Sequence, residues 1–144
     1  MIAVDTNILV YAHRADVEWH DAASRAVGEL AEGTAEWAIP WPCLHEFLAV
    51  VTHPRIFKTP TPGPLAFGQV DAWLESPSLV VLSENEDYVD ALRQTALGAR
   101  VSGARVHDAR VAALCISHGV GELWTADRDF SLFRGLKTRN PLAA

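Results

Sequence analysis

The feature that most constrains the fold is the segment Ile2–Ala12, an apolar run that contains a single carboxylate, Asp5. Its first residues, Ile2–Val4, have the composition of a short buried strand, and Thr6 and Asn7, which follow Asp5, are typical of a helix start. A lone carboxylate beside a core costs free energy unless another group pairs with it. We therefore expect the chain to bring partners for Asp5 from elsewhere in the sequence.

Short apolar strands alternate with helical patterns along the rest of the chain. Further strands are predicted at Trp37–Ile39, Leu79–Leu82, Glu122–Thr125 and Leu136–Thr138. Helices are predicted over Ile8–His13, Glu18–Glu32, Pro42–Thr52, Leu65–Glu75, Glu86–Leu97 and His107–His118, with Asp16 or a neighbour capping the second. The segment 54–64 contains four prolines and is predicted to be a mobile loop. Together these patterns predict one layered α/β domain over residues 1–144 with a largely parallel sheet.

Charge gives two opposing signals. The net charge of −6 argues against a general nucleic-acid binder, because phosphates attract cations. The basic residues are skewed, however, since ten of the twelve are arginines. Four of them lie close together around a short link that contains glycine, namely Arg93, Arg100, Arg105 and Arg110. We give this local cluster more weight than the overall charge, and we expect Arg100, Arg105 and Arg110 to contact nucleic acid.

Cysteine usage and the N-terminus indicate the compartment. Cys43 and Cys115 have neither the spacing of a disulfide framework nor that of a zinc site, and both fall in apolar helical patterns, so we expect buried free thiols. The first residues lack the basic region and cleavage site of a signal peptide, and no apolar run reaches the length of a membrane span. These features predict a cytoplasmic protein without a membrane partner.

The acidic residues fall where a parallel sheet forms its sites, at the carboxyl ends of the strands. Four segments should bring carboxylates to that edge: Asp5 after the first strand, Glu46 in the helix after the second, Asp108 at the start of the helix before the fourth, and Asp127 with Asp129 after the fourth. Such a group needs cations to relieve its repulsion, and oxygen ligands suit Mg²⁺ or Mn²⁺. Two such ions can hold the attacking and leaving oxygens of a phosphodiester.

Each acid also has a simpler explanation. Asp5 could be a helix N-cap, which stabilises a helix by about 1 kcal/mol. Asp108 could favour a helix N-terminus through the dipole, and Glu46 could be a solvated helix residue. Asp127 and Asp129 could be turn residues. The set, rather than any single position, predicts the metal site.

Histidine and tryptophan residues lie near these acids. His45 and His107 each precede a proposed ligand, and consecutive helical residues point about 100° apart, so we do not expect either histidine to share the metal. Trp41, beside Pro42 at a strand end, is the tryptophan best placed to stack on a base.

Four motifs, "VDTNILVYA", "CLHEFLAVV", "HDARVAAL" and "LWTADRDF", resemble those of the PIN-domain ribonucleases, and more narrowly the VapC-type toxins of type II toxin–antitoxin modules. The resemblance covers nearly the whole chain, although residues 54–105 carry no motif of the family. It implies a PIN-like three-layer α/β/α fold with a central, mainly parallel sheet of four to five strands. It also implies a Mg²⁺ or Mn²⁺ site and its supporting polar groups: Asp5, Glu46, Asp108 and Asp127 as catalytic metal ligands, with Thr6, Asn7, Thr125 and Asp129 around them.

The same resemblance implies an activity and partners. The expected reaction is divalent-metal-dependent endoribonuclease cleavage, with tRNA or ribosomal RNA as the target. The expected partners are a second copy of the chain and a small VapB-like antitoxin that blocks the site.

Rival classes differ at identifiable positions. A haloacid-dehalogenase-like phosphohydrolase needs a second aspartate where Asn7 stands, and an EF-hand loop starting at Asp127 needs glycine and glutamate where Leu132 and Thr138 stand. The acids argue against a catalytically idle PIN-like domain. A PIN-domain nuclease with a housekeeping RNA or DNA substrate and no toxin role stays open as the alternative.

Overall fold

The computed structural model describes residues 1–143. Five short strands form one sheet in the order β3-β2-β1-β4-β5, and every pairing is parallel. The strands are β1 (Ile2–Val4), β2 (Trp37–Pro40), β3 (Leu79–Leu82), β4 (Glu122–Trp124) and β5 (Thr138–Arg139). A parallel sheet is covered on both faces, which explains why the inner strands are almost wholly apolar. In β1, for example, Ala3 and Val4 are completely buried.

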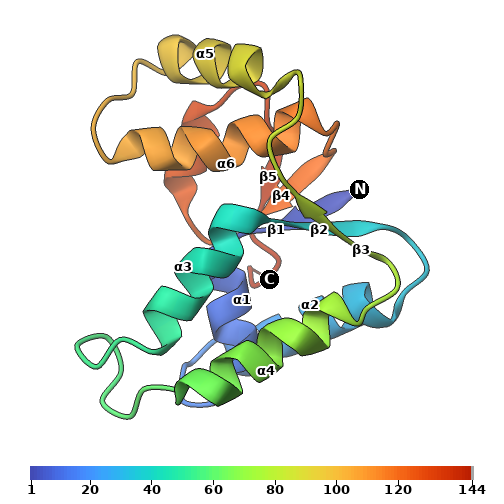
Figure 1. The fold of residues 1–144 in the computed structure, drawn as a ribbon, viewed down its shortest axis with the longest axis vertical. Helices are drawn as coiled ribbons and strands as arrows, with labels where there is room; N and C mark the ends of the chain where they lie inside the picture. Colours follow the sequence, from blue (N-terminus) through green and yellow to red (C-terminus); the bar gives the residue numbers. More distant parts are fainter. Residues whose placement is uncertain (144) are drawn as a thin grey trace.

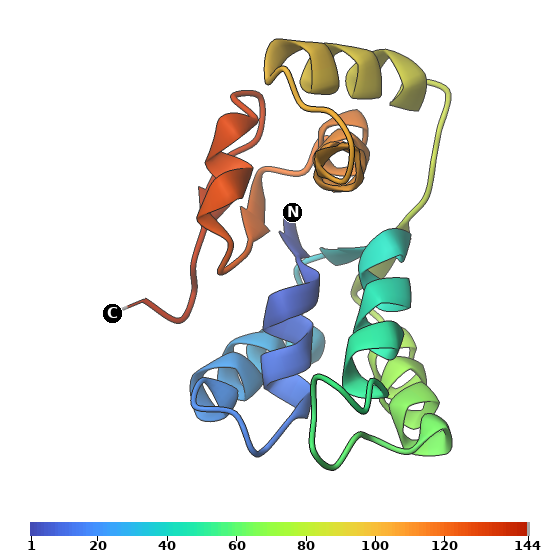
Figure 2. The same cartoon turned by 90° about the vertical axis from the view of Figure 1, so that its left-hand side faces the viewer.

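The helices of the described residues cover both faces of this sheet. They are α1 (Thr6–His13), α2 (His20–Glu32), α3 (Trp41–Val51), α4 (Gly63–Leu74), α5 (Tyr88–Gly98), α6 (Arg105–Ser117) and a short 3₁₀ helix, η1 (Arg128–Leu132). Figures 1 and 2 show α5 and α6 together on one side of the sheet and α1 to α4 on the other. The layers are therefore helix, sheet and helix, as predicted.

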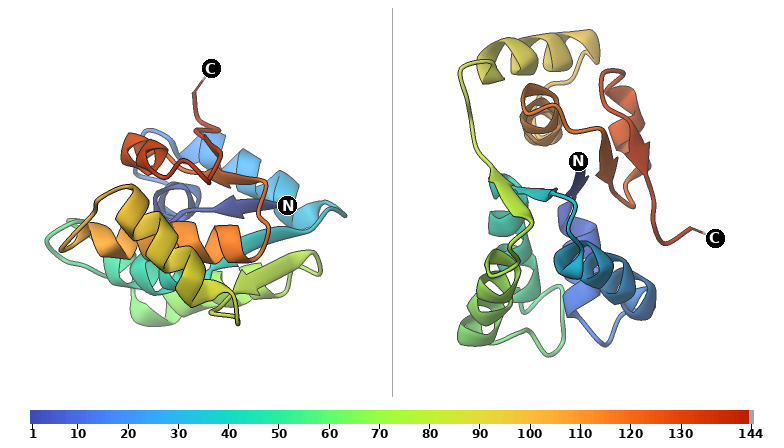
Figure 3. Two further views of the ribbon diagram at one scale, coloured as in Figure 1. Left: turned by 90° about the horizontal axis from the view of Figure 1, so that it is seen from above. Right: turned by 90° about the vertical axis from the view of Figure 1, so that its right-hand side faces the viewer.

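The direction of the crossovers explains this division. The connections from β1 to β2 and from β2 to β3 run toward one edge of the sheet, whereas the connection from β3 returns across the sheet to β4. Right-handed crossovers then place the first two sets of helices on one face and α5 and α6 on the other, as the view from the right in Figure 3 shows. The strand order reverses between β1 and β4, and such a switch point opens a crevice at the carboxyl ends of the strands.

The structure confirms the predicted fold class and corrects several boundaries. α2 begins at His20 rather than near Glu18, and Trp19 precedes it without a side-chain cap. Asp16 does not cap α2, because its carboxylate accepts hydrogen bonds from Arg14 at 2.9 and 2.6 Å. β5 lies at Thr138–Arg139, beyond most of the predicted segment. The other helices begin within two residues of the predicted positions.

The core lies on both sides of the sheet. Its largest fully buried side chains include Trp37 of β2 and Phe47 of α3. Phe47 packs edge-on against Trp73 of α4, with ring centroids 4.8 Å apart. Cys43 and Cys115 are buried free thiols, as predicted. Among the helices of residues 1–143, none combines the length and apolar character that crossing a bilayer requires.

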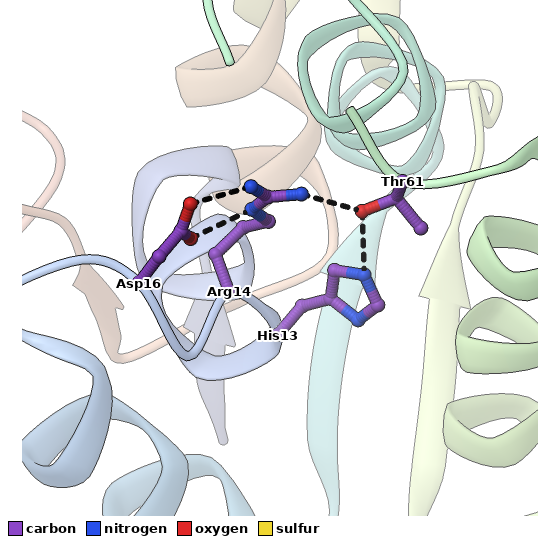
Figure 4. A network of polar contacts seen from close by, with 4 residues as sticks. All are labelled: His13, Arg14, Asp16 and Thr61. Carbon is purple, nitrogen blue, oxygen red and sulfur yellow. Dashed lines mark hydrogen bonds and ion pairs between the residues drawn. The ribbon is translucent and has the colours of Figure 1, made fainter. Parts of the chain in front are cut away.

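The proline-rich loop between α3 and α4 is tied to the body of the protein. The Thr61 N–H donates to the Val51 carbonyl at 2.8 Å, and the Thr61 side chain is buried against the end of α1. Figure 4 shows the Thr61 hydroxyl between His13 and Arg14, at 3.1 Å from each. These contacts give the loop one defined path, where the sequence predicted a mobile segment.

Candidate active site

A cavity of about 760 Å³ opens at the switch point, where β1 and β4 end. It brings together side chains from both helical layers, since α3 supplies one wall and the start of α6 the opposite one. All four predicted metal ligands line it: Asp5, Glu46, Asp108 and Asp127. Four segments that are far apart in sequence therefore present carboxylates to one space.

Asp5 occupies the floor of this cavity and is only 5% exposed. It is the N-cap of α1, because its Oδ1 accepts from the Thr6 N–H at 2.8 Å. Its other oxygen accepts from the Thr125 hydroxyl at 2.7 Å. Burial raises the pKa of Asp5 from 3.8 to about 6, although these hydrogen bonds oppose the shift. Asp5 is thus both the cap of α1 and part of the cavity floor.

Asn7 and Thr125 join the ends of β1 and β4. The Asn7 side-chain amide donates to Thr125 Oγ1 at 3.3 Å and accepts from the Ala126 N–H at 3.0 Å. Thr125 Oγ1 also accepts from the Asp127 N–H at 3.0 Å. This network fixes the backbone on both sides of Asp5 and orients the start of the segment that carries Asp127. Two of the predicted supporting residues, Asn7 and Thr125, therefore join the strand ends at the cavity floor.

Glu46 faces the same floor from α3, which lies in the same helical layer as α1. Its Oε2 accepts from the Thr6 hydroxyl at 3.1 Å, which joins α3 to the start of α1. Thr6 is buried, whereas Glu46 is exposed toward the cavity. If Glu46 turned toward a cation, the buried Thr6 hydroxyl would keep a second acceptor, the Cys43 carbonyl at 3.5 Å.

The opposite wall carries Asp108, in the first turn of α6. Burial, and next the charge of Asp127, raise the pKa of Asp108. Arg105 lies between this wall and η1: its Nη2 donates to Asp129 Oδ2 at 2.8 Å, and its Nη1 lies 3.9 Å from Asp108 Oδ2. Asp129 lies beside the cavity and outside its lining, held by Arg105 and by its N–H bond to Asp127 Oδ1 at 2.9 Å.

The donor set fits a divalent cation. Within residues 1–143, no three of the Asp, Glu, His and Cys side chains already converge as ligands on one point. Mg²⁺ does not require such convergence, because one or two carboxylates and several waters complete its shell. Burial, and next repulsion from Asp127, raise the pKa of Asp108. Repulsion disfavours a closed group of bare carboxylates, and a cation relieves it. The carboxylates that line the cavity are Asp5, Glu46, Asp108 and Asp127.

The arginines predicted to contact nucleic acid occupy different places. Arg110 lines the cavity and pairs with Glu84 at 3.3 Å. Arg105 is engaged by Asp129, as described above. Arg100 lies in the link before α6 with a φ of 54°, on the exterior and away from the cavity. The three therefore differ in their relation to the acids: Arg110 lines the cavity, Arg105 pairs with acids at its edge, and Arg100 does not line it.

Comparison with known proteins shows the family of this chain. The PIN domain family model matches residues 2–136. Ribonuclease VapC43 of Mycobacterium tuberculosis is 37% identical over 142 residues, which cover 99% of this chain and 96% of that protein. The chain belongs to the PIN-domain family of VapC ribonucleases. A second relative, ribonuclease VapC48 of M. tuberculosis, is 31% identical over 140 residues, with 96% of each chain covered.

Solved structures of VapC proteins share the fold of this chain. The VapBC2 complex of Rickettsia felis, bound to a promoter DNA fragment, matches with a TM-score of 0.72 and 20% identity over 97% of this chain and 98% of that one. M. tuberculosis VapC20, a toxin that cleaves the sarcin–ricin loop, matches with a TM-score of 0.66 and 19% identity over 91% and 93% of the two chains. Both likenesses concern the PIN fold.

Two features of this PIN-domain site were not predicted. The Cys43 thiol donates to Asp5 Oδ1 at 3.5 Å, and burial keeps that thiol neutral by raising its pKa well above the usual value. His45 and His107 both line the cavity beside the proposed ligands. Cys43 lies three residues before Glu46 on one helix, a spacing that could have suggested the shared face.

Proposed function

We propose that this chain is a Mg²⁺- or Mn²⁺-dependent endoribonuclease in which Asp5, Glu46, Asp108 and Asp127 hold the ion. The observation that carries the proposal is their convergence on one cavity from four separate segments. Membership of the VapC ribonucleases supports RNA as the substrate, and nucleases of this family generally use divalent metals. The bound ion would activate water and stabilise the charge that develops on the phosphate.

The chain's own residues have distinct parts in this proposal. Asp5 holds its carboxylate in a fixed position, because Thr6 and Thr125 hydrogen-bond to its two oxygens. Glu46 and Asp108 face each other from the two helical layers and set the width of the cavity. Arg110 is the cation best placed to meet a phosphate beside the acids, once it leaves its exposed pair with Glu84.

The role as a toxin and its partners belong to the same proposal. The VapC relatives and the likeness to the VapBC2 complex support a toxin whose antitoxin resembles VapB, and a homodimer is the expected assembly. A short reading frame for a DNA-binding antitoxin next to this gene would separate a toxin from a housekeeping nuclease. The expected RNA target is tRNA or ribosomal RNA, and the expected site of action is the cytoplasm.

Cleavage of RNA by the purified protein tests the proposal. Total RNA and a DNA control are incubated with Mg²⁺ or Mn²⁺, with and without EDTA, beside Asp5→Asn and Asp108→Asn. We expect RNA cleavage that EDTA abolishes and that each variant loses by at least about 100-fold, because an ion bound by fewer carboxylates stabilises less charge. Asp71→Asn, an exposed carboxylate of α4, serves as the matched control. Cleavage at the wild-type rate by both folded site variants would contradict the assignment.

A further inference from the structure

The cavity has two chemically different parts. One part, at the sheet edge, carries the four carboxylates. The other continues away from the sheet between α1, α3 and the proline-rich loop, and its lining there is predominantly apolar: Val10, Tyr11, Ala49, Val50, Ile56 and Phe57. The proposed chemistry uses only the first part, which leaves the second without a function.

Helix geometry sets the spacing between the two parts. The cavity lining runs from Thr6 to Tyr11 along α1 and from Pro42 to Val50 along α3, so the carboxylate of Glu46 and the apolar Val50 lie four residues apart on one helix. Four residues of helix span about 6 Å. Figure 2 shows α1 and α3 leaving the sheet side by side, with the loop passing across their far ends. A nucleotide also has a charged part and an apolar part separated by a similar length. Its phosphate lies at one end and the apolar faces of its base at the other.

Ile56 and Phe57 form the far wall of this apolar part. Their N–H groups both donate to the His53 carbonyl at 3.1 Å, which closes a tight turn. Ile56 is 53% exposed although it is a large hydrophobic residue, and it lies in the cavity wall. Phe57 is partly buried, because the Arg14 guanidinium covers its ring at 4.1 Å. The wall therefore offers apolar surface to a ligand and is supported from behind.

A polar clamp fixes this wall relative to α1. The Gln69 side-chain amide lies within hydrogen-bond distance of the His13 ring, with 3.1 Å between Gln69 Oε1 and His13 Nδ1. His13 Nε2 lies 3.1 Å from the Thr61 hydroxyl, whose oxygen accepts from Arg14 Nη1 at 3.1 Å (Figure 4). Arg14 is also held by both carboxylate oxygens of Asp16. Thr61 thus ties the loop to the same arginine that supports Phe57.

We propose that Ile56 and Phe57 contact the base of one nucleotide next to the cleaved phosphodiester, and that Thr61 positions them through Arg14 and His13. The ligand is an unpaired base in RNA, because its flat apolar faces match an apolar wall and do not require a particular hydrogen-bond pattern. This inference rests on the proposed ribonuclease activity and names what selects its substrate.

Abasic substitution tests the contact. Each base of an RNA oligonucleotide that the wild type cleaves is replaced in turn by an abasic site. We expect KM to rise about tenfold at one position beside the cut, the loss typical of one base contact, with kcat within about twofold. Ile56→Ala should reduce this penalty, because part of the wall is gone, whereas Leu97→Ala, which removes an exposed apolar side chain from α5, should retain it in full.

Two results overturn the inference in distinguishable ways. If the wild type cleaves RNA and Ile56→Ala keeps the full abasic penalty, the base contact is wrong and the ribonuclease proposal stands. If the wild type cleaves no RNA, both are wrong.

Two substitutions of Thr61 test the clamp separately. Thr61→Val keeps the shape but removes the hydroxyl, so KM should rise about as far as in Ile56→Ala while kcat stays close to the wild-type value. Thr61→Ser keeps the hydroxyl and should restore the wild-type KM. Equal KM values for the valine and serine variants would contradict the positioning role, and measured unfolding curves would separate this effect from a loss of folded protein.

Discussion

At the scale of single residues, Asp5 shows which contacts of the site the sequence can predict and which it cannot. The segment after β1 allowed two interpretations of Asp5, a helix cap or a metal ligand, and the structure shows the cap while placing the same carboxylate in the cavity. The partners at Thr6 and Thr125 could be anticipated, since both lie at strand ends. The contact with Cys43 could not, because it depends on how closely α3 packs on β1.

The raised pKa of Asp5 predicts a pH-dependent stability in the absence of metal. Burial favours the neutral carboxyl, so this group stabilises the fold fully below pH 3.8 and loses that contribution as pH rises through about 6. A shift of this size is worth up to about 3 kcal/mol. Asparagine does not ionise. In EDTA at pH 7.5, we expect Asp5→Asn to exceed the wild type in free energy of unfolding, with the difference disappearing near pH 4.

Urea unfolding at the two pH values measures this difference. Asp71→Asn should change the free energy of unfolding by less than about 0.5 kcal/mol at both, because that carboxylate is exposed on α4. A wild type that is more stable than Asp5→Asn at pH 7.5 in EDTA would show that the carboxylate is not destabilised by burial.

At the scale of elements, hydrophobic periodicity identified every α-helix and strand of the described residues but not their limits, and it did not identify the 3₁₀ helix η1. α2 starts late because Asp16 is engaged by Arg14, a pairing that competes with capping and leaves no periodic signal. The proline-rich loop looked mobile because four prolines suggest only irregular backbone. Its path is decided by Thr61, His13 and Arg14, which come from different segments and meet only in the folded chain.

The helices α5 and α6, which form one helical layer, should differ in local stability. None of the residues of α5, Tyr88–Gly98, is fully buried, whereas α6 buries six residues against the sheet. Local opening costs little where few apolar groups are hidden. In hydrogen exchange followed by mass spectrometry, we expect the amides of α5 to exchange at least about tenfold faster than those in the centre of α6. Equal protection of the two helices would contradict this difference in packing.

At the scale of the whole molecule, topology makes the site. The alternation of strands and helices predicted a parallel sheet, and parallel sheets form their crevices where the strand order reverses. The carboxylates could therefore be assigned to one sheet edge before the strand order was known. The apolar half of the cavity was beyond sequence analysis, because it is formed by the far ends of α1 and α3 and by a loop without periodicity.

The central claim is that the converging carboxylates bind a divalent ion, and titration with Mn²⁺ followed by electron paramagnetic resonance tests it most directly. The free Mn²⁺ signal is recorded for the wild type, Asp5→Asn, Asp108→Asn and the control Asp71→Asn. We predict that the wild type and the control bind Mn²⁺ and that each site variant binds at least about tenfold more weakly, because each loses one charged oxygen ligand. Binding of equal affinity and stoichiometry by the folded site variants and the wild type would contradict the claim.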